Sequence, residues 1–351
     1  MTDPAAPETP AAPWRVLLGG VLMGLANLVP GVSGGTMILA MGLYDRFIGA
    51  LADVFRLRLS RSAIVFLALI SVGAGVALVG FSGLAVTLVT EQRWIMYSLF
   101  IGMTLGGAPE LFAECRPLRG GIVAAFLATF AGMAALAWGL SDANLPESTA
   151  VFVFMGVLGA SSMILPGISG SYMLLIFGMY DVVVGSLSVS ALKESPMDSL
   201  KVLVPVGIGA ALGMALLSNA LKHLLAKHSA MTHAALAGLL VGSVLGLWPF
   251  REPVTPELSN KPFRKAVAAL VAGEALADVN AEFGVELDEP RAAELRATYV
   301  GKSGGDLKRI AGELRPFDPS PGQMGGALGL FVLGFALTRS LSRRSEPRAS
   351  A

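Results

Sequence analysis

Two segments of the chain combine hydroxyl side chains, glycines and a proline within apolar sequence, which is a composition suited to holding an anion. The segment Pro-Gly-Val-Ser-Gly-Gly-Thr returns 136 residues later as Pro-Gly-Ile-Ser-Gly-Ser. Hydroxyl groups and free amide groups at a helix start donate hydrogen bonds, and glycine lets a ligand approach the backbone closely. The expected site residues are Pro30, Gly31, Ser33, Gly34, Gly35, Thr36, Pro166, Gly167, Ser169, Gly170 and Ser171.

The same residues also suit a structural role, because small side chains let helical arms pack closely in a membrane. The repetition favours function. Between 30–51 and 166–187, 11 of 22 positions are identical, and the Pro-Gly-x-Ser-Gly core is kept in both copies. The apolar segments contain no carboxylate pair, nucleophile with a neighbouring base, or nucleotide-binding loop. We therefore expect a binding function that is not enzymatic and uses no cofactor.

Four further polar side chains lie close to the two motifs. Asp45 and Asp181 occupy matched positions, and we expect them to end the arms that follow the breaks, either as solvated caps or as proton carriers. Arg46 is a candidate phosphate contact, although such a side chain can also simply reach the membrane interface. Asn27 adds a polar group just before the first motif.

Three histidines, His223, His228 and His233, do not predict a metal site. Their spacing of five places successive rings about 140° apart on a helix, and no carboxylate stands between them. We expect them in a solvated cytoplasmic loop and expect no metal. The single Cys115 allows no disulfide within the chain.

Composition identifies the surroundings of these motifs as a membrane. Apolar residues make up 54% of the chain, charged residues 15%, and the mean hydropathy is +0.67. The net charge of +1 leaves no basic footprint for nucleic acid. Stretches of spanning length and without internal charge predict an integral membrane protein whose spans are all helical. The expected spans are 62–89, 94–112, 120–140, 201–221, 233–250 and 325–341.

The chain divides into two repeats, and each contains a motif unit followed by three of these spans. The first repeat covers 15–140, with its motif unit at 15–51, and the second covers 149–341, with its motif unit at 149–187. A polar insertion, 251–323, interrupts the second repeat. We expect the terminal segments 1–14 and 342–351 to be a disordered tail and a basic tail, both in the cytoplasm.

The distribution of Lys and Arg decides how the motif units enter the membrane. The count leaves out the insertion. If each unit is a re-entrant helical hairpin, 12 of the basic residues counted lie on one face and 3 on the other, whereas a single crossing splits them 8 to 7. The first distribution follows the positive-inside rule. Three spans separate the hairpins, so the second must enter from the opposite face. The predicted fold is an inverted repeat with an extracytoplasmic insertion, an architecture common in transporters.

The two motifs and the segment GSVLGLWP, 242–249, resemble the DUF368 family of prokaryotic membrane proteins. The resemblance covers about 14–341 apart from the insertion. It implies a protein of the bacterial cytoplasmic membrane that flips or recycles undecaprenyl phosphate or a related polyprenyl phosphate lipid, with the phosphate at the motifs. Many members carry an acid where this chain has Asn27, which weakens a proton-coupling role at that position.

Two other functions remain open on sequence grounds. An ion-coupled transporter of a small soluble anion would use the same cradle of hydroxyl and amide groups. An intramembrane lipid-phosphate phosphatase would need acid–base or nucleophilic side chains within the spans, and the spans contain almost none.

Overall fold

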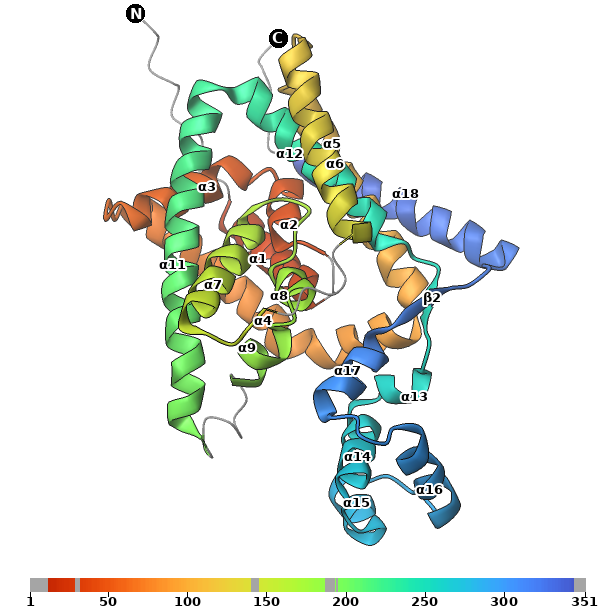
Figure 1. Ribbon diagram of the computed structural model, residues 1–351. Coiled ribbons are helices and arrows are strands. Elements are labelled where there is room, and N and C mark those ends of the chain that lie inside the picture. Colours follow the sequence, from red (N-terminus) through yellow and green to blue (C-terminus); the bar gives the residue numbers. More distant parts are fainter. Residues whose placement is uncertain (1–11, 29–31, 140–144, 187–192, 194, 344–351) are drawn as a thin grey trace, which may run out of the picture. The chain divides into compact units, whose positions relative to one another are not determined.

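Helices form nearly all of the regular structure in this computed structural model (Figure 1), which describes the chain except residues 1–11, 29–31, 140–144, 187–192, 194 and 344–351. The chain separates into two units, Met1–Trp248 with Gly325–Ala351 and Pro249–Met324. The helices of the first unit are α1 (Pro13–Leu28), α2 (Gly34–Ala40), α3 (Tyr44–Phe55), α4 (Arg61–Glu91), α5 (Arg93–Ala113), α6 (Gly120–Gly139), α7 (Thr149–Ile164), α8 (Gly170–Ile176), α9 (Tyr180–Ser186), α11 (Pro196–Lys227), α12 (Ser229–Ser243), the short 3-10 helix η1 (Val244–Leu247) and α18 (Pro321–Arg343).

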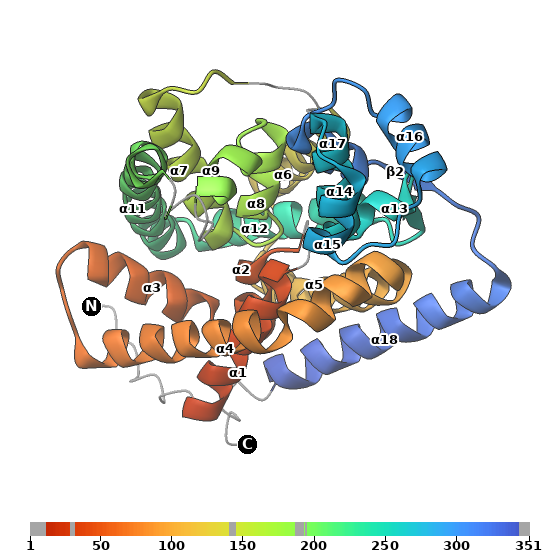
Figure 2. The same cartoon turned by 90° about the horizontal axis from the view of Figure 1, so that it is seen from below.

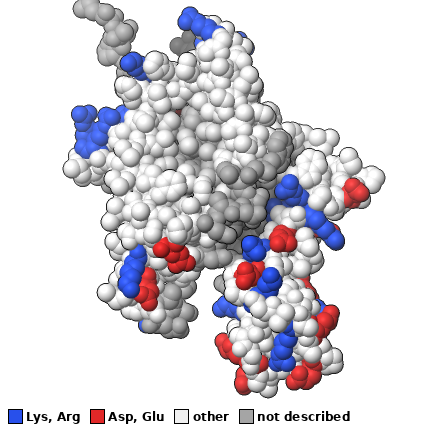
Figure 3. Space-filling model, in the orientation of Figure 1, with Lys and Arg blue, Asp and Glu red and all other residues white. Residues whose placement is uncertain are grey.

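Six of these helices, α4, α5, α6, α11, α12 continued by η1, and α18, are long and apolar enough to cross a membrane. Their uncharged side chains face lipid at little cost, while the helical backbone satisfies its own polar groups. On α11, for example, charged residues occur near both ends but not between Lys201 and Lys222. Figure 3 shows the same pattern as a broad uncharged surface over this part of the unit. The prediction of a multi-pass membrane protein with helical spans is confirmed.

The segment after each motif differs from the single arm that we expected. Helix α2 ends at Ala40 and α3 begins at Tyr44, because Gly42 adopts a φ of 64° that side chains other than glycine rarely tolerate. The amide of Leu43 then donates to the carbonyl of Ile38 at 3.1 Å, which satisfies a terminal carbonyl of α2. Gly178, with a φ of 70°, separates α8 from α9 in the same way.

Asp45 and Asp181 therefore start helices, which corrects the expectation that they end the arms after the motifs. Asp45 lies in the first turn of α3, where a carboxylate interacts favourably with the positive end of the helix dipole. Asp181 lies in the first turn of α9, and its side chain is outside the described part of the structure.

Glycines hold the long helices of each repeat against the helix that precedes the motif. A Cβ atom at Gly20 of α1 would lie 2.3 Å from the carbonyl oxygen of Ile70, and one at Gly73 of α4 would lie 2.3 Å from that of Leu17. The same contacts recur 136 residues later between α7 and α11, so the duplication extends from the motif into the packing of the spans. These pairs are Gly156 with Val206 at 2.1 Å and Gly209 with Val153 at 2.0 Å.

The last helix of each repeat packs against the other repeat. Helix α18 lies along α5, where a Cβ atom at Gly102 would meet the carbonyl oxygen of Phe331 at 2.1 Å (Figure 2). Helix α6 lies along α12, where a Cβ atom at Gly238 would meet the carbonyl oxygen of Phe126 at 2.3 Å. This exchange ties the two repeats into one unit.

The second unit has a small core of its own. It contains α13 (Pro256–Ser259), α14 (Lys261–Ala272), α15 (Leu276–Phe283), α16 (Glu289–Thr298), α17 (Gly304–Gly312) and an antiparallel pair of short strands, β1 (Arg251–Pro253) and β2 (Leu314–Pro316). Leu258, Val267, Leu270 and Leu295 are almost completely buried there. The helices agree with the expected helical patches, whereas the strand pair is an exception to the all-helical prediction.

Histidine 233 also corrects a prediction. It is buried on α12, and its Nδ1 atom lies 2.9 Å from the carbonyl oxygen of Ser229. His223 and His228 are exposed at the end of α11, as expected of solvated residues, but they lie within and at the end of a helix.

Close helix packing can be tested with two glycines on α11. We expect Gly209→Ala to destabilise the protein by about 1–3 kcal/mol, because the added methyl group overlaps the backbone of α7. Gly207, two residues away, has open space where its Cβ would be, so Gly207→Ala should be neutral or slightly stabilising. Thermal unfolding in detergent measures the stability of both variants, and equal stability of the two would contradict the close packing of α11 on α7.

Candidate functional site

The two motifs meet and bind each other directly. The amide of Gly167, in the second motif, donates to Oγ1 of Thr36, in the first, at 2.8 Å. The hydroxyl of Ser33 donates to the carbonyl oxygen of Leu165 at 3.0 Å. Residues 131 or 132 positions apart along the chain are thus joined by two hydrogen bonds that cross from one repeat to the other.

Ser33 has an unusual role for a residue that precedes a helix. It stands at the N-cap of α2 in an extended conformation, with φ −95° and ψ 129°, but its side chain makes no capping hydrogen bond to α2. A serine in this position usually accepts from the first turn. Here the hydroxyl instead reaches across to the second motif, which indicates that the bond between the motifs determines its orientation.

Glycine at position 35 is required by the close approach of the end of α7, which precedes the second motif. A Cβ atom there would lie 2.9 Å from the carbonyl oxygen of Ile164 and 3.0 Å from that of Met163. Gly34 has a different neighbour, since its Cβ would lie 2.9 Å from Oδ1 of Asn27 on α1. The Asn27 amide therefore lies beside Gly34 of the first motif, while its part in a binding site stays a prediction.

The second motif is fitted against helices of its own repeat. Gly167 has a φ of +89°, and a Cβ atom there would lie 2.7 Å from the carbonyl oxygen of Leu239 on α12. A Cβ atom at Gly170 would lie 2.6 Å from the carbonyl oxygen of Gly159 on α7. The hydroxyls of Ser169 and Ser171 lie 3.0 Å apart, so one donates to the other.

The joined motifs are closed to solvent in this structure. Ser33 is 2% exposed, Thr36 1% and Ser169 6%. The hydroxyls of Ser33 and Thr36 bond to the opposite repeat, and those of Ser169 and Ser171 bond to each other. The helices α2 and α8 are only seven residues long. Pro30 and Gly31 lie outside the described residues. The structure brings Ser33 and Thr36 against Leu165 and Gly167, while anion binding by the two motifs stays a prediction.

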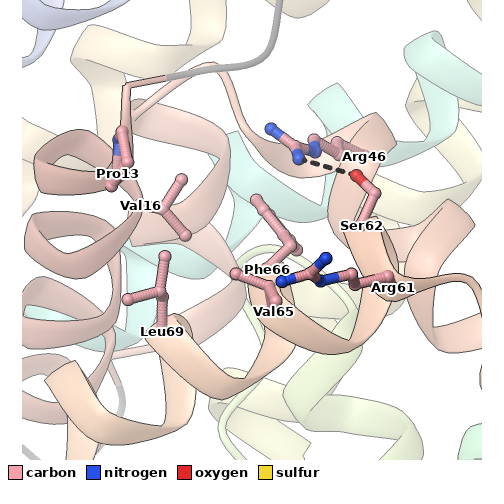
Figure 4. Close-up of a pocket in the computed structure, with 8 residues that line it drawn as sticks. All are labelled: Pro13, Val16, Arg46, Arg61, Ser62, Val65, Phe66 and Leu69. Atoms are coloured by element: carbon pink, nitrogen blue, oxygen red, sulfur yellow. Dashed lines mark hydrogen bonds between the residues drawn. The ribbon is translucent and has the colours of Figure 1, made fainter.

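Arg46 and Asp45 lie away from this junction, beside the start of α4. The guanidinium group of Arg46 donates to the Ser62 hydroxyl at 3.3 Å and stacks over the Phe66 ring, with its central carbon 4.5 Å from the ring centre. Arg46 lines a cavity of about 480 Å³ that has largely apolar walls. Figure 4 shows the side chains that line it. The predicted grouping of Arg46 with the motif residues has no support among these contacts.

Two basic residues missed by the sequence analysis connect the helices around the motifs. Arg15 of α1 donates to the carbonyl oxygens of Met41, at the turn after α2, and of Leu341, near the end of α18. Lys222 of α11 forms an ion pair with Asp53 of α3 at 2.6 Å. The contacts of Arg15 with Leu341 and of Lys222 with Asp53 join elements from different repeats, whereas that of Arg15 with Met41 lies within the first repeat. The pairs Lys222–Asp53 and Arg15–Leu341 are 169 and 326 positions apart, so the spacing of these residues along the chain could not have predicted them.

The fold and the site together define a class. The chain is a multi-pass helical membrane protein in which two copies of a broken-helix motif meet in a buried junction between repeats.

Comparison with known proteins narrows this class. Residues 23–262 match the undecaprenyl phosphate translocase-like family, and the chain belongs to that family. A polyprenyl-phosphate transporter of Staphylococcus aureus is 32% identical over 247 residues, which are 67% of this chain and 86% of the relative. A polyprenyl-phosphate transporter of Vibrio cholerae is 30% identical over 264 residues, 68% of this chain and 78% of the relative. No solved structure matches the chain.

The bond between the motifs can be tested at Thr36. Thr36→Val keeps the shape of the side chain but leaves the buried amide of Gly167 without its acceptor, so we expect a loss of about 1–3 kcal/mol in stability. Thr36→Ser keeps the hydroxyl and should retain most of the stability. Thermal unfolding in detergent distinguishes the two variants. If Thr36→Val were as stable as the unmodified protein, the bond would contribute nothing to stability.

Proposed function

We propose that this protein carries a polyprenyl phosphate, such as undecaprenyl phosphate, across the bacterial cytoplasmic membrane, and that the joined motifs hold its phosphate. The observation that carries the proposal is the direct pairing of Ser33 and Thr36 with the backbone of the second motif. In this arrangement the two copies of the motif would form one site. The choice of a polyprenyl phosphate as the cargo is based on membership of the translocase-like family and on the names of the two relatives.

A phosphate can take the place of the bonds that close the site. Its oxygens accept hydrogen bonds, so they can replace Oγ1 of Thr36 as the acceptor for the Gly167 amide and replace the Leu165 carbonyl as the acceptor for the Ser33 hydroxyl. The Thr36 hydroxyl can then turn to donate as well. The number of hydrogen bonds is kept in this exchange, and those to the charged phosphate are stronger than those between neutral groups.

This exchange addresses the main cost of moving a lipid phosphate. A phosphate bears one or two negative charges, and taking such a charge into hydrocarbon without compensation costs several kcal/mol or more. Amide and hydroxyl donors at a buried junction replace the lost hydration. The prenyl chain needs no such site, since it can stay in the surrounding lipid. Proton coupling by Asp45 or Asp181 stays a prediction.

The proposal includes the orientation of the repeats. Three spanning helices, α4, α5 and α6, separate the two motif units. An odd number of crossings would bring the second motif unit to the membrane from the face opposite the first motif unit. Each motif unit would enter as a re-entrant hairpin. Both termini would lie in the cytoplasm, and the unit Pro249–Met324 would lie outside the cell. Access to a shared site could then alternate between the two faces.

Removing the motif hydroxyls should slow transport. We expect Ser33→Ala and Ser169→Ala each to reduce the rate by about tenfold or more, since each removes a donor to a charged group that is worth about 1.5–3 kcal/mol. Flux of a polyprenyl phosphate into vesicles that contain the purified protein measures this. Gly34→Val should be more severe, because a larger side chain would collide with Asn27 and Met23.

Ser218→Ala is the matched control for these variants. Ser218 is fully buried on α11, and among the described residues its hydroxyl bonds to the carbonyl of Ala215 in its own helix. The Ser218→Ala variant should transport the lipid at the normal rate. Full activity of the Ser33→Ala/Ser169→Ala double variant would leave the motifs with a packing role alone, and flux of inorganic phosphate without any lipid flux would replace the lipid by a soluble anion.

Orientation can be tested by labelling single cysteines in intact cells. Cys115 is the natural cysteine of the chain and is buried, so Cys115→Ser provides a background without reactive thiols. With Gly305→Cys in the second unit we expect labelling by a membrane-impermeant reagent from outside, and with Arg58→Cys only after the cells are opened. Labelling of both variants from the same face would contradict the predicted topology.

A further inference from the structure

The loop between α3 and α4 exposes two leucines. Leu57 is 84% exposed and Leu59 60%. Among the residues that the structure describes, Leu57 is the one other than glycine with a positive φ, 58°. Such a conformation is disfavoured for leucine, because its Cβ atom comes too close to the following carbonyl oxygen. An exposed leucine at a strained position gains little from packing within the protein, so its side chain is available to something outside it.

Hydrogen bonds on both sides fix the backbone of this loop. The amide of Arg58 donates to the carbonyl oxygen of Asp53 at 2.9 Å, a bond that ends α3 with Leu57 as the left-handed residue. On the other side, the Ser60 hydroxyl accepts from the amide of Ala63 at 3.1 Å and caps α4. The exposed leucines therefore belong to a defined turn, and their exposure is a property of the fold.

Arginines alternate with the leucines along this loop. The exposed arginines are Arg56, Arg58 and Arg61. Segment 45–61 contains one more arginine, Arg46, and two carboxylates, Asp45 and Asp53. Lys222 of α11 pairs with Asp53. Positive charge thus exceeds negative charge in this segment, and the loop itself is purely basic.

The loop lies where a membrane span begins. Arg61 is the first residue of α4, and Arg61–Gly80 is long and apolar enough to cross a membrane. Ile64 and Val65, about one turn into α4, are also exposed, so an exposed apolar surface continues from the leucines along the span. At the edge of its hydrocarbon core a bilayer presents lipid phosphates, which attract basic residues. The loop therefore matches this boundary in both charge and polarity.

We propose that the α3–α4 loop, residues 56–61, binds acidic phospholipids of the surrounding membrane. Its three arginines contact lipid phosphates, and Leu57 and Leu59 insert among the first carbons of the hydrocarbon chains. Headgroups with a net negative charge are preferred, since an ammonium group beside the phosphate is repelled by the arginines. The site is separate from the motif junction, and it depends neither on the proposed cargo nor on the orientation of the repeats.

Native mass spectrometry of the purified full chain tests the charge preference. The protein is mixed with phosphatidylglycerol or phosphatidylcholine of the same acyl chains, and bound lipid is counted. We expect phosphatidylglycerol to be retained in preference. The double variant Arg56→Gln/Arg58→Gln should weaken its binding about tenfold, a factor that corresponds to 1.4 kcal/mol. Equal retention of the two lipids by the unmodified protein would overturn the proposal.

Lys201→Gln is the matched control at another spanning helix. Lys201 lies near the start of α11, close in sequence to the exposed side chains of Met197 and Leu200, but it is paired with Asp198 at 2.8 Å. Because its charge is already offset, this variant should retain phosphatidylglycerol like the unmodified protein. A loss as large as that of the arginine double variant would mean that any cation at the edge of a span suffices, which contradicts a specific role of the loop.

The insertion of the leucines is tested by fluorescence quenching in phosphatidylglycerol vesicles. A fluorophore is attached to Leu57→Cys in the Cys115→Ser background, and Leu59→Cys provides a second position with the same expectation. Lipids with brominated acyl chains should quench this fluorophore strongly, and acrylamide in the water on both sides only weakly. Val300→Cys is the control, because Val300 is 75% exposed but belongs to the polar second unit, and acrylamide should quench it strongly. Equal quenching of the loop and control positions by acrylamide would show that the loop faces water and overturn the proposal.

Discussion

A helix that breaks in buried, apolar surroundings leaves peptide groups that only other parts of the protein can satisfy, and this constraint shapes the whole first unit. The chain breaks at matched places before α2 and before α8. It satisfies part of the exposed backbone by bringing the two breaks together, through Thr36 with Gly167 and Ser33 with Leu165. The cost of an unpaired amide in this environment, several kcal/mol, makes such pairing close to obligatory.

The arrangement of the long helices follows from this junction. Small residues let α4 lie directly on α1 and α11 on α7, so that the arms leading to the breaks are held at fixed positions. The last helix of each repeat then crosses to the other repeat, and Arg15 and Lys222 add polar contacts between them. The close helix packing, the crossing of the last helix of each repeat to the other repeat, and the polar contacts of Arg15 and Lys222 all resist separation of the two motifs. A ligand that binds at the junction therefore competes with hydrogen bonds rather than with the packing of the spans.

Much of the fold was accessible from the sequence because membrane spans depend on local composition. A run of about 20 apolar residues has one stable solution in lipid, so the six expected spans agree with helices to within a few residues at most ends. Exceptions occur where a single backbone conformation decides the outcome. Gly42 and Gly178 divide the arms after the motifs, and an isolated glycine in an apolar run could equally have remained helical. The strand pair of the second unit depends on residues more than 60 positions apart, which local patterns do not connect.

The sequence by itself determined that this protein is a duplicated membrane protein, that Pro-Gly-x-Ser-Gly is what the duplication preserves, and that the family resemblance holds. These are properties of composition and of repetition along the chain. Only the tertiary structure decided that the two motifs share one buried junction and that Arg46 belongs to a different place beside α4. The reason is physical: which polar groups meet depends on how glycine-lined helices pack in three dimensions, and the distance between two residues along the chain carries no information about that packing.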